Sequence, residues 1–254
     1  MSGRSQINTA TLKYFRNSDA KSLLVFVHGL GGDNSNGYWG RLPDFLRHAS
    51  ELGPYDFAFW QYPTHAYPSP RWLELWRRKR LPEIAKIADS LATDITSLLV
   101  AKPYSRVSLV GHSLGGLVLF EYIRNRVAFE KHHNVASVAV LGSPFRSSFL
   151  AHVAALLHLR SNRQVTYLTR DKRLVRLMAE GLKLCKTLEI QTWYFSSLED
   201  DVVDSDPLYG LFDKHEVVSG PHLWMPRVAS INDSGYQALL RFVRYTGAVT
   251  TKLS

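Results

Sequence analysis

The feature that most constrains the fold is a serine between two glycines at the end of an apolar strand. Residues 106–110 form a short, mostly apolar strand, and Gly-His-Ser-Leu-Gly follows at once at residues 111–115. An amphipathic helix is expected directly afterwards, over residues 117–126. So sharp a strand-to-helix turn requires neighbours without bulky side chains, because the flanking backbone is crowded. The turn would lift the Ser113 hydroxyl above the sheet, beside a helix N-terminus that favours negative charge.

Apolar strands and helices alternate along the rest of the chain. Residues 22–27 are a nearly continuous apolar run, which is typical of a strand buried on both faces. The other expected strands are residues 11–15 at a sheet edge, 56–62, 135–141 and, as the last of them, 191–195; the other expected helices are residues 84–98, 149–188 and 236–245. This alternation predicts a mostly parallel sheet flanked by helices. No linker is long enough to divide it, so we expect one α/β domain over residues 1–254.

A glycine-rich turn, His-Gly-Leu-Gly-Gly at residues 28–32, follows the strand at residues 22–27. Acyl transfer requires backbone N–H donors that point at the negative oxygen of the transition state. A glycine-rich turn allows the backbone to approach a reacting carbonyl, and we expect the N–H groups of Leu30 and Leu114 to be these donors. The alternative is an ordinary turn between a strand and a helix. His28 is expected to support the turn by hydrogen bonding.

An acidic stretch follows the strand at residues 191–195, where open α/β folds place their sites. Its four carboxylates are candidates for an acid that would orient a histidine, and most of them are expected to be solvated. They are Glu199, Asp200, Asp201 and Asp204.

Two histidines follow this acidic stretch, and in proteins with this serine turn the histidine comes after the acid in the chain. His215 lies among charged residues at the start of a possible strand, whereas His222 lies in a loop just before the last helix. Such a loop can bring an imidazole over the edge of the sheet, and so we expect His222 to be the base. His112, beside the serine, is expected to pack the turn.

Taken together, these residues resemble the α/β-hydrolase superfamily. They are most similar to its serine esterase and lipase branch, which includes GPI inositol-deacylase-like and serine-active-site-containing proteins. The matching motifs are residues 26–32, 111–117, 141–144 and 200–203, followed by the loop at His222, and they cover the chain from about residue 22 to residue 245. The resemblance implies an α/β-hydrolase fold with a helical insert or lid. It implies Ser113 as nucleophile, Asp200 as acid, with Asp201 the alternative, and His222 as base.

Two departures from that branch leave the pocket shape and the substrate class open. Residues 144–147 read Pro-Phe-Arg-Ser, where the branch often has Pro-His-x-Gly. Asp204 follows the valine pair, where a proline is common. Neither departure removes a predicted catalytic group.

The expected function is a serine hydrolase that cleaves carboxylic esters through an acyl-enzyme, without a metal or cofactor. A small-molecule or lipid ester is the expected substrate. A thioesterase or an acyltransferase would use the same residues. A non-catalytic hydrolase-fold binding protein is the alternative from another class. A nucleophile, a base, an acid and a glycine-rich turn for the oxyanion are all present in the sequence, and this favours the enzyme over the binding protein.

Two segments are candidate lids and specificity determinants. Residues 63–82 combine tryptophans with a basic run, and they would either contact an anionic membrane at its periphery or form a solvated connection. Residues 149–188 have an apolar face that would line an acyl pocket or pack in the core. The expected substrate-binding residues in and beside these segments are Trp72, Phe145 and Phe149.

The composition restricts partners and compartment. The chain has 31 Lys and Arg against 22 Asp and Glu, but no nucleic-acid-binding motif accompanies this basic excess, and we expect no nucleic-acid partner. A single cysteine, Cys185, excludes an internal disulfide framework and is expected in the core. With no apolar leader or spanning segment, a cytoplasmic location is expected. The oligomeric state stays open.

Overall fold

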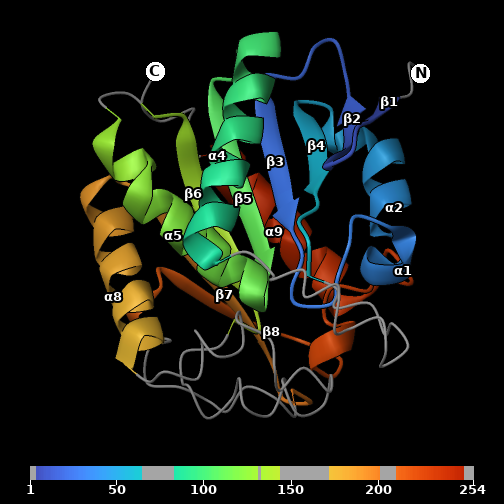
Figure 1. The fold of residues 1–254 in the computed structure, drawn as a ribbon. Coiled ribbons are helices and arrows are strands. Elements are labelled where there is room, and N and C mark those ends of the chain that lie inside the picture. Colours follow the sequence, from blue (N-terminus) through green and yellow to red (C-terminus); the bar gives the residue numbers. More distant parts are fainter. Residues whose placement is uncertain (1–3, 65–82, 131–132, 144–171, 201–209, 249–254) are drawn as a thin grey trace, which may run out of the picture.

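A computed structural model describes residues 4–64, 83–130, 133–143, 172–200 and 210–248 of the protein. Within these residues, eight strands form one sheet in the order β1-β2-β4-β3-β5-β6-β7-β8 (Figure 1). The strands are β1 (Ser5–Asn8), β2 (Leu12–Arg16), β3 (Ser22–Val27), β4 (Tyr55–Trp60), β5 (Arg106–His112), β6 (Val135–Leu141), β7 (Gln191–Ser197) and β8 (Lys214–Val218).

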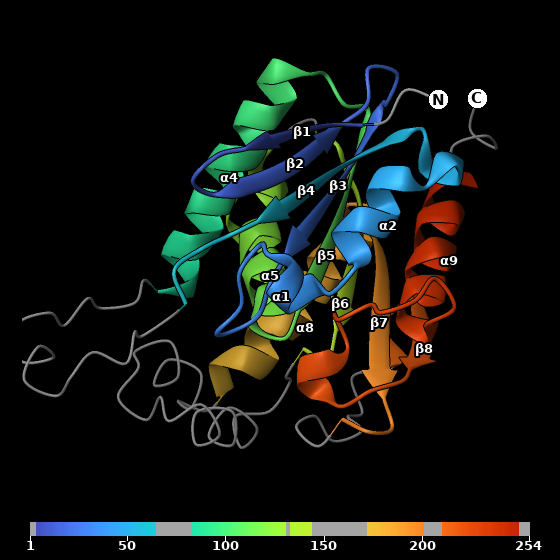
Figure 2. The same cartoon turned by 90° about the vertical axis from the view of Figure 1, so that its right-hand side faces the viewer.

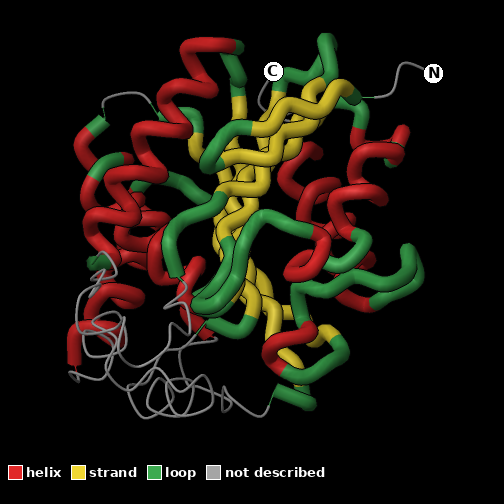
Figure 3. The backbone as a smooth tube through the Cα atoms, turned by 45° about the vertical axis from the view of Figure 1, so that its right-hand side comes forward, coloured by secondary structure: helices red, strands yellow, loops and turns green. Residues whose placement is uncertain are grey.

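Helices cover both faces of this sheet, as Figures 2 and 3 show. The face that carries α4, α5 and α8 has one apolar core, and the face that carries α1, α2 and α9 has another. The helices are α1 (Asn36–Trp39), α2 (Leu42–His48), α4 (Ile84–Ala101), α5 (Leu114–Asn125), α8 (Lys172–Thr187) and α9 (Ser234–Ala248), with short 3-10 turns η1 (Ser50–Leu52), η2 (Val127–Phe129) and η4 (His222–Trp224). In the described part of the chain, no helix has the length and apolar character that crossing a bilayer requires.

The central strand β3 shows why the sheet is buried on both sides. Leu23, Val25 and Val27 pack into the core beneath α4 and α5. Leu24 and Phe26 alternate with them and pack into the core on the opposite face. A continuous apolar run is therefore what a strand in this position requires, and the prediction for residues 22–27 is confirmed.

Parallel pairing brings the ends of the central strands to one edge of the sheet. β3 pairs with both β4 and β5, and β6 joins β5 to β7, all in parallel. The register sets Val27 opposite Gly111, and His112 opposite Leu141. The segments that follow β3, β5, β6 and β7 therefore begin side by side, at the edge where α/β sheets carry their sites.

Two expectations about the sheet edges are wrong. Residues 11–15 do not lie at an edge, because β2 is covered by β1, whose residues are all exposed. Residues 191–195 are not the last strand, because β8 follows and pairs with β7. The strand β1 is unexpected, whereas β8 matches the possible strand that begins near His215. Both are polar edge strands held by backbone hydrogen bonds, and they lack the apolar alternation that reveals a half-buried strand.

The predicted helices differ from those of the structure mainly at their first and last residues. The helix after the serine begins at Leu114 rather than at residue 117, and α9 extends the predicted final helix by a few residues at each end. Of the expected helical insert at residues 149–188, the structure describes α8, and the part before residue 172 lies outside the described residues. The short helix α2 was not expected from the sequence.

Candidate active site

Ser113 lies on a strained turn between β5 and α5. Its backbone has φ 52° and ψ −119°, a conformation that residues other than glycine rarely adopt. Two hydrogen bonds hold it: its N–H donates to the carbonyl of Leu141 at 2.9 Å, and the Ser143 hydroxyl donates to its carbonyl at 2.9 Å. Such strain persists only where the surroundings impose it, and it is characteristic of functional positions.

The glycine after the serine is required by a close approach between α5 and β3. A β-carbon at Gly115 would lie 2.3 Å from the carbonyl oxygen of Val27, a distance that packing does not permit. The spacing of the motif therefore has a steric cause, because the helix must begin directly over a neighbouring strand to form the turn.

A hydrogen-bonded chain joins Ser113 to His222 and Asp200. The Ser113 Oγ lies 3.0 Å from His222 Nε2, and His222 Nδ1 lies 3.2 Å from Asp200 Oδ2. A carboxylate only accepts hydrogen bonds, so the imidazole proton is on Nδ1, and the lone pair of Nε2 faces the serine hydroxyl. The side chains of His222 and Asp200 are 1% and 2% exposed, respectively. An imidazole held in this way can take up the proton of Ser113.

Gly142, directly after β6, makes room for the Asp200–His222 pair. Its φ is +51°, and a β-carbon there would lie 3.0 Å from both Asp200 Oδ2 and His222 Nδ1. Glycine satisfies the backbone conformation and the close approach together. Gly142 belongs to the motif at residues 141–144, but the sequence pattern alone gives it no role.

The glycine-rich turn after β3 borders the same serine. A β-carbon on Gly29 would lie 2.9 Å from the Ser113 β-carbon, and the N–H of Gly29 donates to the Tyr38 hydroxyl at 2.7 Å. Within the described ranges, the N–H groups of Leu30 and Leu114 donate to no backbone or side-chain acceptor. Leu114 directly follows Ser113 in the chain, and Leu30 directly follows Gly29, which borders Ser113.

His28 supports this turn, as expected. Its Nδ1–H donates to the Gly29 carbonyl at 2.8 Å, and its Nε2 accepts from the Tyr62 N–H at 3.2 Å. Its ring also stacks on that of Tyr62, with 4.3 Å between the centroids. Because both ring nitrogens are engaged, His28 is poorly suited to act as a base.

The other candidate base, His215, belongs to a different pair. Its Nε2 lies 2.7 Å from the Ser196 hydroxyl, and this pair is exposed where the end of β7 pairs with β8. Ser196 has no strained turn, since it continues β7. The structure therefore brings His222, and not His215, to Ser113.

His112 does more than pack the turn, because it has two hydrogen-bond partners that no sequence motif indicates. Its ring hydrogen-bonds to the Tyr38 hydroxyl through Nδ1, and its Nε2 lies 3.0 Å from the carbonyl oxygen of His222. Burial, with a smaller effect of the His222 ring, holds the pKa of His112 well below its usual value. Tyr38 lies in the short helix α1, and no sequence motif marks it.

Several predicted residues lie outside the described residues. They are Trp72, Phe145, Phe149, Asp201 and Asp204, together with residues 65–82 of the first candidate lid. Cys185 is buried, as expected, and burial raises the pKa of its thiol to about 12. Across the described residues, no three His, Cys, Asp or Glu side chains are grouped to hold a metal ion.

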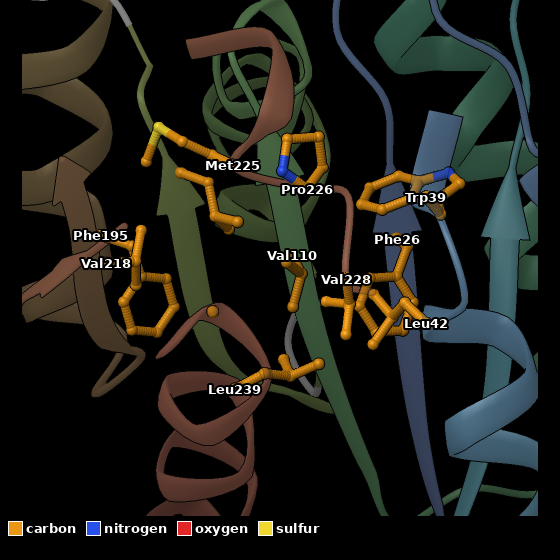
Figure 4. Close-up of a pocket in the computed structure, with 12 residues that line it drawn as sticks. Phe26, Trp39, Leu42, Val110, Phe195, Val218, Met225, Pro226, Val228 and Leu239 are labelled. Carbon is orange, nitrogen blue, oxygen red and sulfur yellow. The ribbon is translucent and has the colours of Figure 1, made fainter. Parts of the chain in front are cut away.

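A small apolar cavity lies beneath the loop that carries His222 (Figure 4). Its volume is about 20 Å³, and it is lined by Phe26 and Val110 from the sheet and by Met225 and Pro226 from the loop. Ligand pockets usually enclose roughly 300 Å³ or more. We therefore interpret this cavity as a packing defect under the His222 loop and not as a substrate-binding pocket.

A strained serine after a central parallel strand, with a histidine and an acid from later segments, defines an α/β hydrolase. The model of the alpha/beta hydrolase family matches residues 24–243, and the chain belongs to this family. This confirms the superfamily and the fold that the motifs predict. No curated protein matches the chain in sequence.

Solved structures share the fold at low identity. A carboxylesterase of the ammonia-oxidizing thaumarchaeon Nitrososphaera gargenis is 12% identical with a TM-score of 0.58, covering 96% of this chain and 99% of that chain. MGS-MChE2, an α/β hydrolase from a lagoon-sediment metagenome of Mar Chica, Morocco, is 15% identical with a TM-score of 0.56, covering 95% and 98%. A bacterial membrane phospholipase A is 18% identical with a TM-score of 0.52, covering 95% and 87%. At these identities the likeness concerns the fold.

Proposed function

We propose that the protein is a serine hydrolase that cleaves carboxylic esters. Ser113 is the nucleophile, His222 the general base and Asp200 the acid that orients it. The observation that carries this proposal is the buried hydrogen-bonded chain from Ser113 to Asp200, with 3.0 Å and 3.2 Å between successive partners. The position of Ser113 on the strained turn after β5 supports the same assignment.

Acylation follows from this geometry. As Ser113 Oγ attacks the ester carbonyl carbon, its proton passes to His222 Nε2, and the carbonyl oxygen becomes negative. The N–H groups of Leu30 and Leu114 stabilise this oxyanion. Asp200 stabilises the imidazolium and keeps it oriented. The imidazolium then protonates the leaving alcohol oxygen as the ester C–O bond breaks, and the acyl group stays on Ser113.

Deacylation repeats these steps with water. His222 Nε2 removes a proton from a water molecule, and the hydroxide attacks the acyl carbonyl carbon. The second tetrahedral intermediate collapses, the bond to Ser113 Oγ breaks, and His222 returns the proton to the serine. The carboxylic acid leaves, and the site is restored.

The ester class is supported by the family and by the neighbouring structures, which include a carboxylesterase and a phospholipase A. A thioesterase or an acyltransferase would use the same residues and differ in the leaving group or the acceptor. The basic segment at residues 63–82 is proposed to bring the site to anionic lipid surfaces. Assays with ester, thioester and phospholipid substrates distinguish these activities.

Hydrolysis assays with two matched pairs of variants test the proposal. The substrates are p-nitrophenyl acetate and butyrate, an acyl thioester, and a phospholipid in neutral and anionic vesicles. We expect Ser113→Ala and His222→Ala to abolish turnover. Ser196→Ala and His215→Ala each disrupt the second Ser–His pair, whose atoms lie 2.7 Å apart, and these two variants should retain turnover. A folded wild-type protein that turns over none of these substrates would favour the non-catalytic binding protein.

A further inference from the structure

A second hydrogen-bonded chain crosses the site behind Ser113. It begins at the N–H of Gly29 in the glycine-rich turn, which donates to the Tyr38 hydroxyl at 2.7 Å. Tyr38 is hydrogen-bonded to Nδ1 of His112, and Nε2 of the same ring lies 3.0 Å from the backbone carbonyl of His222. The chain thus joins the turn that carries the oxyanion donors to the loop that carries the base.

Simple bonding rules give every proton in this chain its place. A backbone carbonyl only accepts, so His112 Nε2 carries the hydrogen that reaches His222. Burial keeps the pKa of His112 low and the ring neutral, so Nδ1 has a lone pair and Tyr38 donates to it. The Tyr38 oxygen then accepts from the Gly29 N–H. The four groups form one directed chain.

The imidazole in the middle of this chain is buried, and Tyr38 is partly buried. His112 is 1% exposed, and its ring centroid lies 5.0 Å from that of His222 and 5.7 Å from that of Tyr38. A buried donor or acceptor that loses its partner is penalised by desolvation, so each group holds the next in place.

We propose that Tyr38 and His112 are positioning residues, which fix the His222 loop and the oxyanion turn relative to each other across Ser113. The inference rests on the proposed function and goes beyond it, because neither side chain contacts the reacting atoms in that mechanism. Displacement of either arm would misplace the imidazole or the Leu30 N–H. Misplacement of this kind lowers the rate of the chemical step more than it weakens substrate binding.

The test compares Tyr38→Phe with Tyr55→Phe. Each variant removes one hydrogen-bonded tyrosine hydroxyl, and that of Tyr55 donates to the Val243 carbonyl at 3.1 Å, at the opposite end of the central strands. We expect Tyr38→Phe to slow labelling by a fluorophosphonate and to lower kcat on p-nitrophenyl butyrate by about 10-fold, with KM little changed. Tyr55→Phe should label and turn over at the wild-type rate.

His112 variants and ring NMR test the chain itself. His112→Leu should lower kcat at least as much as Tyr38→Phe, and adding Tyr38→Phe to it should lower kcat no further. His112→Gln, whose amide can still donate to the His222 carbonyl, should recover part of the loss. Histidine ring 15N spectra of the wild type should show His112 as the Nε2–H tautomer.

Three results would overturn the inference: wild-type rates in Tyr38→Phe, additive losses in the double variant, or a proton on His112 Nδ1. A wild type that does not react with the fluorophosphonate would instead remove the proposed function, and with it the catalytic role of the chain. The two failures are distinguishable, because only the second leaves the wild type itself unlabelled.

Discussion

Ser113, His222 and Asp200 depend on each other at the scale of single atoms. The imidazole presents a lone pair to the serine only while its other nitrogen is protonated, and the Asp200 carboxylate, 3.2 Å away, fixes that proton. Substitution of Asp200, or of the Gly142 that packs against this pair, should therefore slow the reaction of Ser113.

Replacement of the acid by its amide should disable the base without removing it. Asp200→Asn can donate to His222 Nδ1 and so favours the wrong tautomer, and we expect kcat on p-nitrophenyl butyrate to fall by about 10³-fold or more. Asp201→Asn is the control, since Asp201 is the alternative acid from the sequence. A large loss in Asp201→Asn, with Asp200→Asn nearly active, would move the role to Asp201.

Gly142 should tolerate no side chain. In Gly142→Ala the new β-carbon would lie 3.0 Å from both Asp200 Oδ2 and His222 Nδ1, and the residue would have to keep φ +51°. We expect the labelling rate to fall by about 10-fold or more. Gly210→Ala is the matched control, because nothing lies within 4 Å of a β-carbon at that position. Equal rates in the two variants would contradict this reading of Gly142.

At the scale of elements, the segment before β1 is anchored by one side chain. The buried Arg4 guanidinium donates to backbone carbonyls around the end of α2 and η1, and it lies 4.7 Å from the centre of the Phe57 ring. The acceptors are the carbonyls of Leu46, Arg47, Ala49, Leu52 and Tyr55. This one residue therefore ties the exposed edge strand to the α2 side of the sheet.

Arg4→Lys should destabilise the fold although it keeps the charge. A lysine ammonium has three donors and no planar fork, so several of these carbonyls would lose their partner. We expect the free energy of unfolding in urea to fall by about 2 kcal/mol. Arg16→Lys, at the exposed end of β2, should change it little. An unchanged midpoint in Arg4→Lys would show that the anchor does not stabilise the fold.

The elements also show what sequence patterning can and cannot reveal. The strands β3, β5, β6 and β7 are apolar and buried, and the sequence predicts each of them within a few residues. The strands β1 and β8 lie at the edges, where backbone pairing suffices and polar side chains are tolerated. The helix α2 has seven residues, too few for a helical period to stand out.

At the scale of the whole molecule, the sheet gathers segments that are far apart in the sequence. Motif order alone predicts which residues to examine for nucleophile, acid and base, and parallel pairing explains how those segments meet. The contacts of Tyr38 and His112 could not be predicted, because they depend on how α1, the end of β5 and η4 pack together at that edge. No local pattern in a single sequence encodes such packing.

The neutral, buried His112 should make the stability of the whole molecule depend on pH. Its folded pKa lies well below 6.5, so below that pH the unfolded chain binds a proton that the folded protein does not. Stability should therefore fall as pH drops from 7 to 5, by up to about 1.4 kcal/mol per pH unit from this group. Urea unfolding at both pH values should show a shallower loss in His112→Gln. Equal losses would contradict a neutral His112.

The most direct test of the account is to find which serine reacts. Wild-type protein would be incubated with a fluorophosphonate, digested, and the modified peptide identified by mass spectrometry, with Ser113→Ala, His222→Ala and Ser196→Ala in parallel. We predict one adduct, on Ser113, in wild type and Ser196→Ala, and none in the other two variants. An adduct on another serine, or labelling that persists in folded Ser113→Ala, would contradict the assignment of the active site.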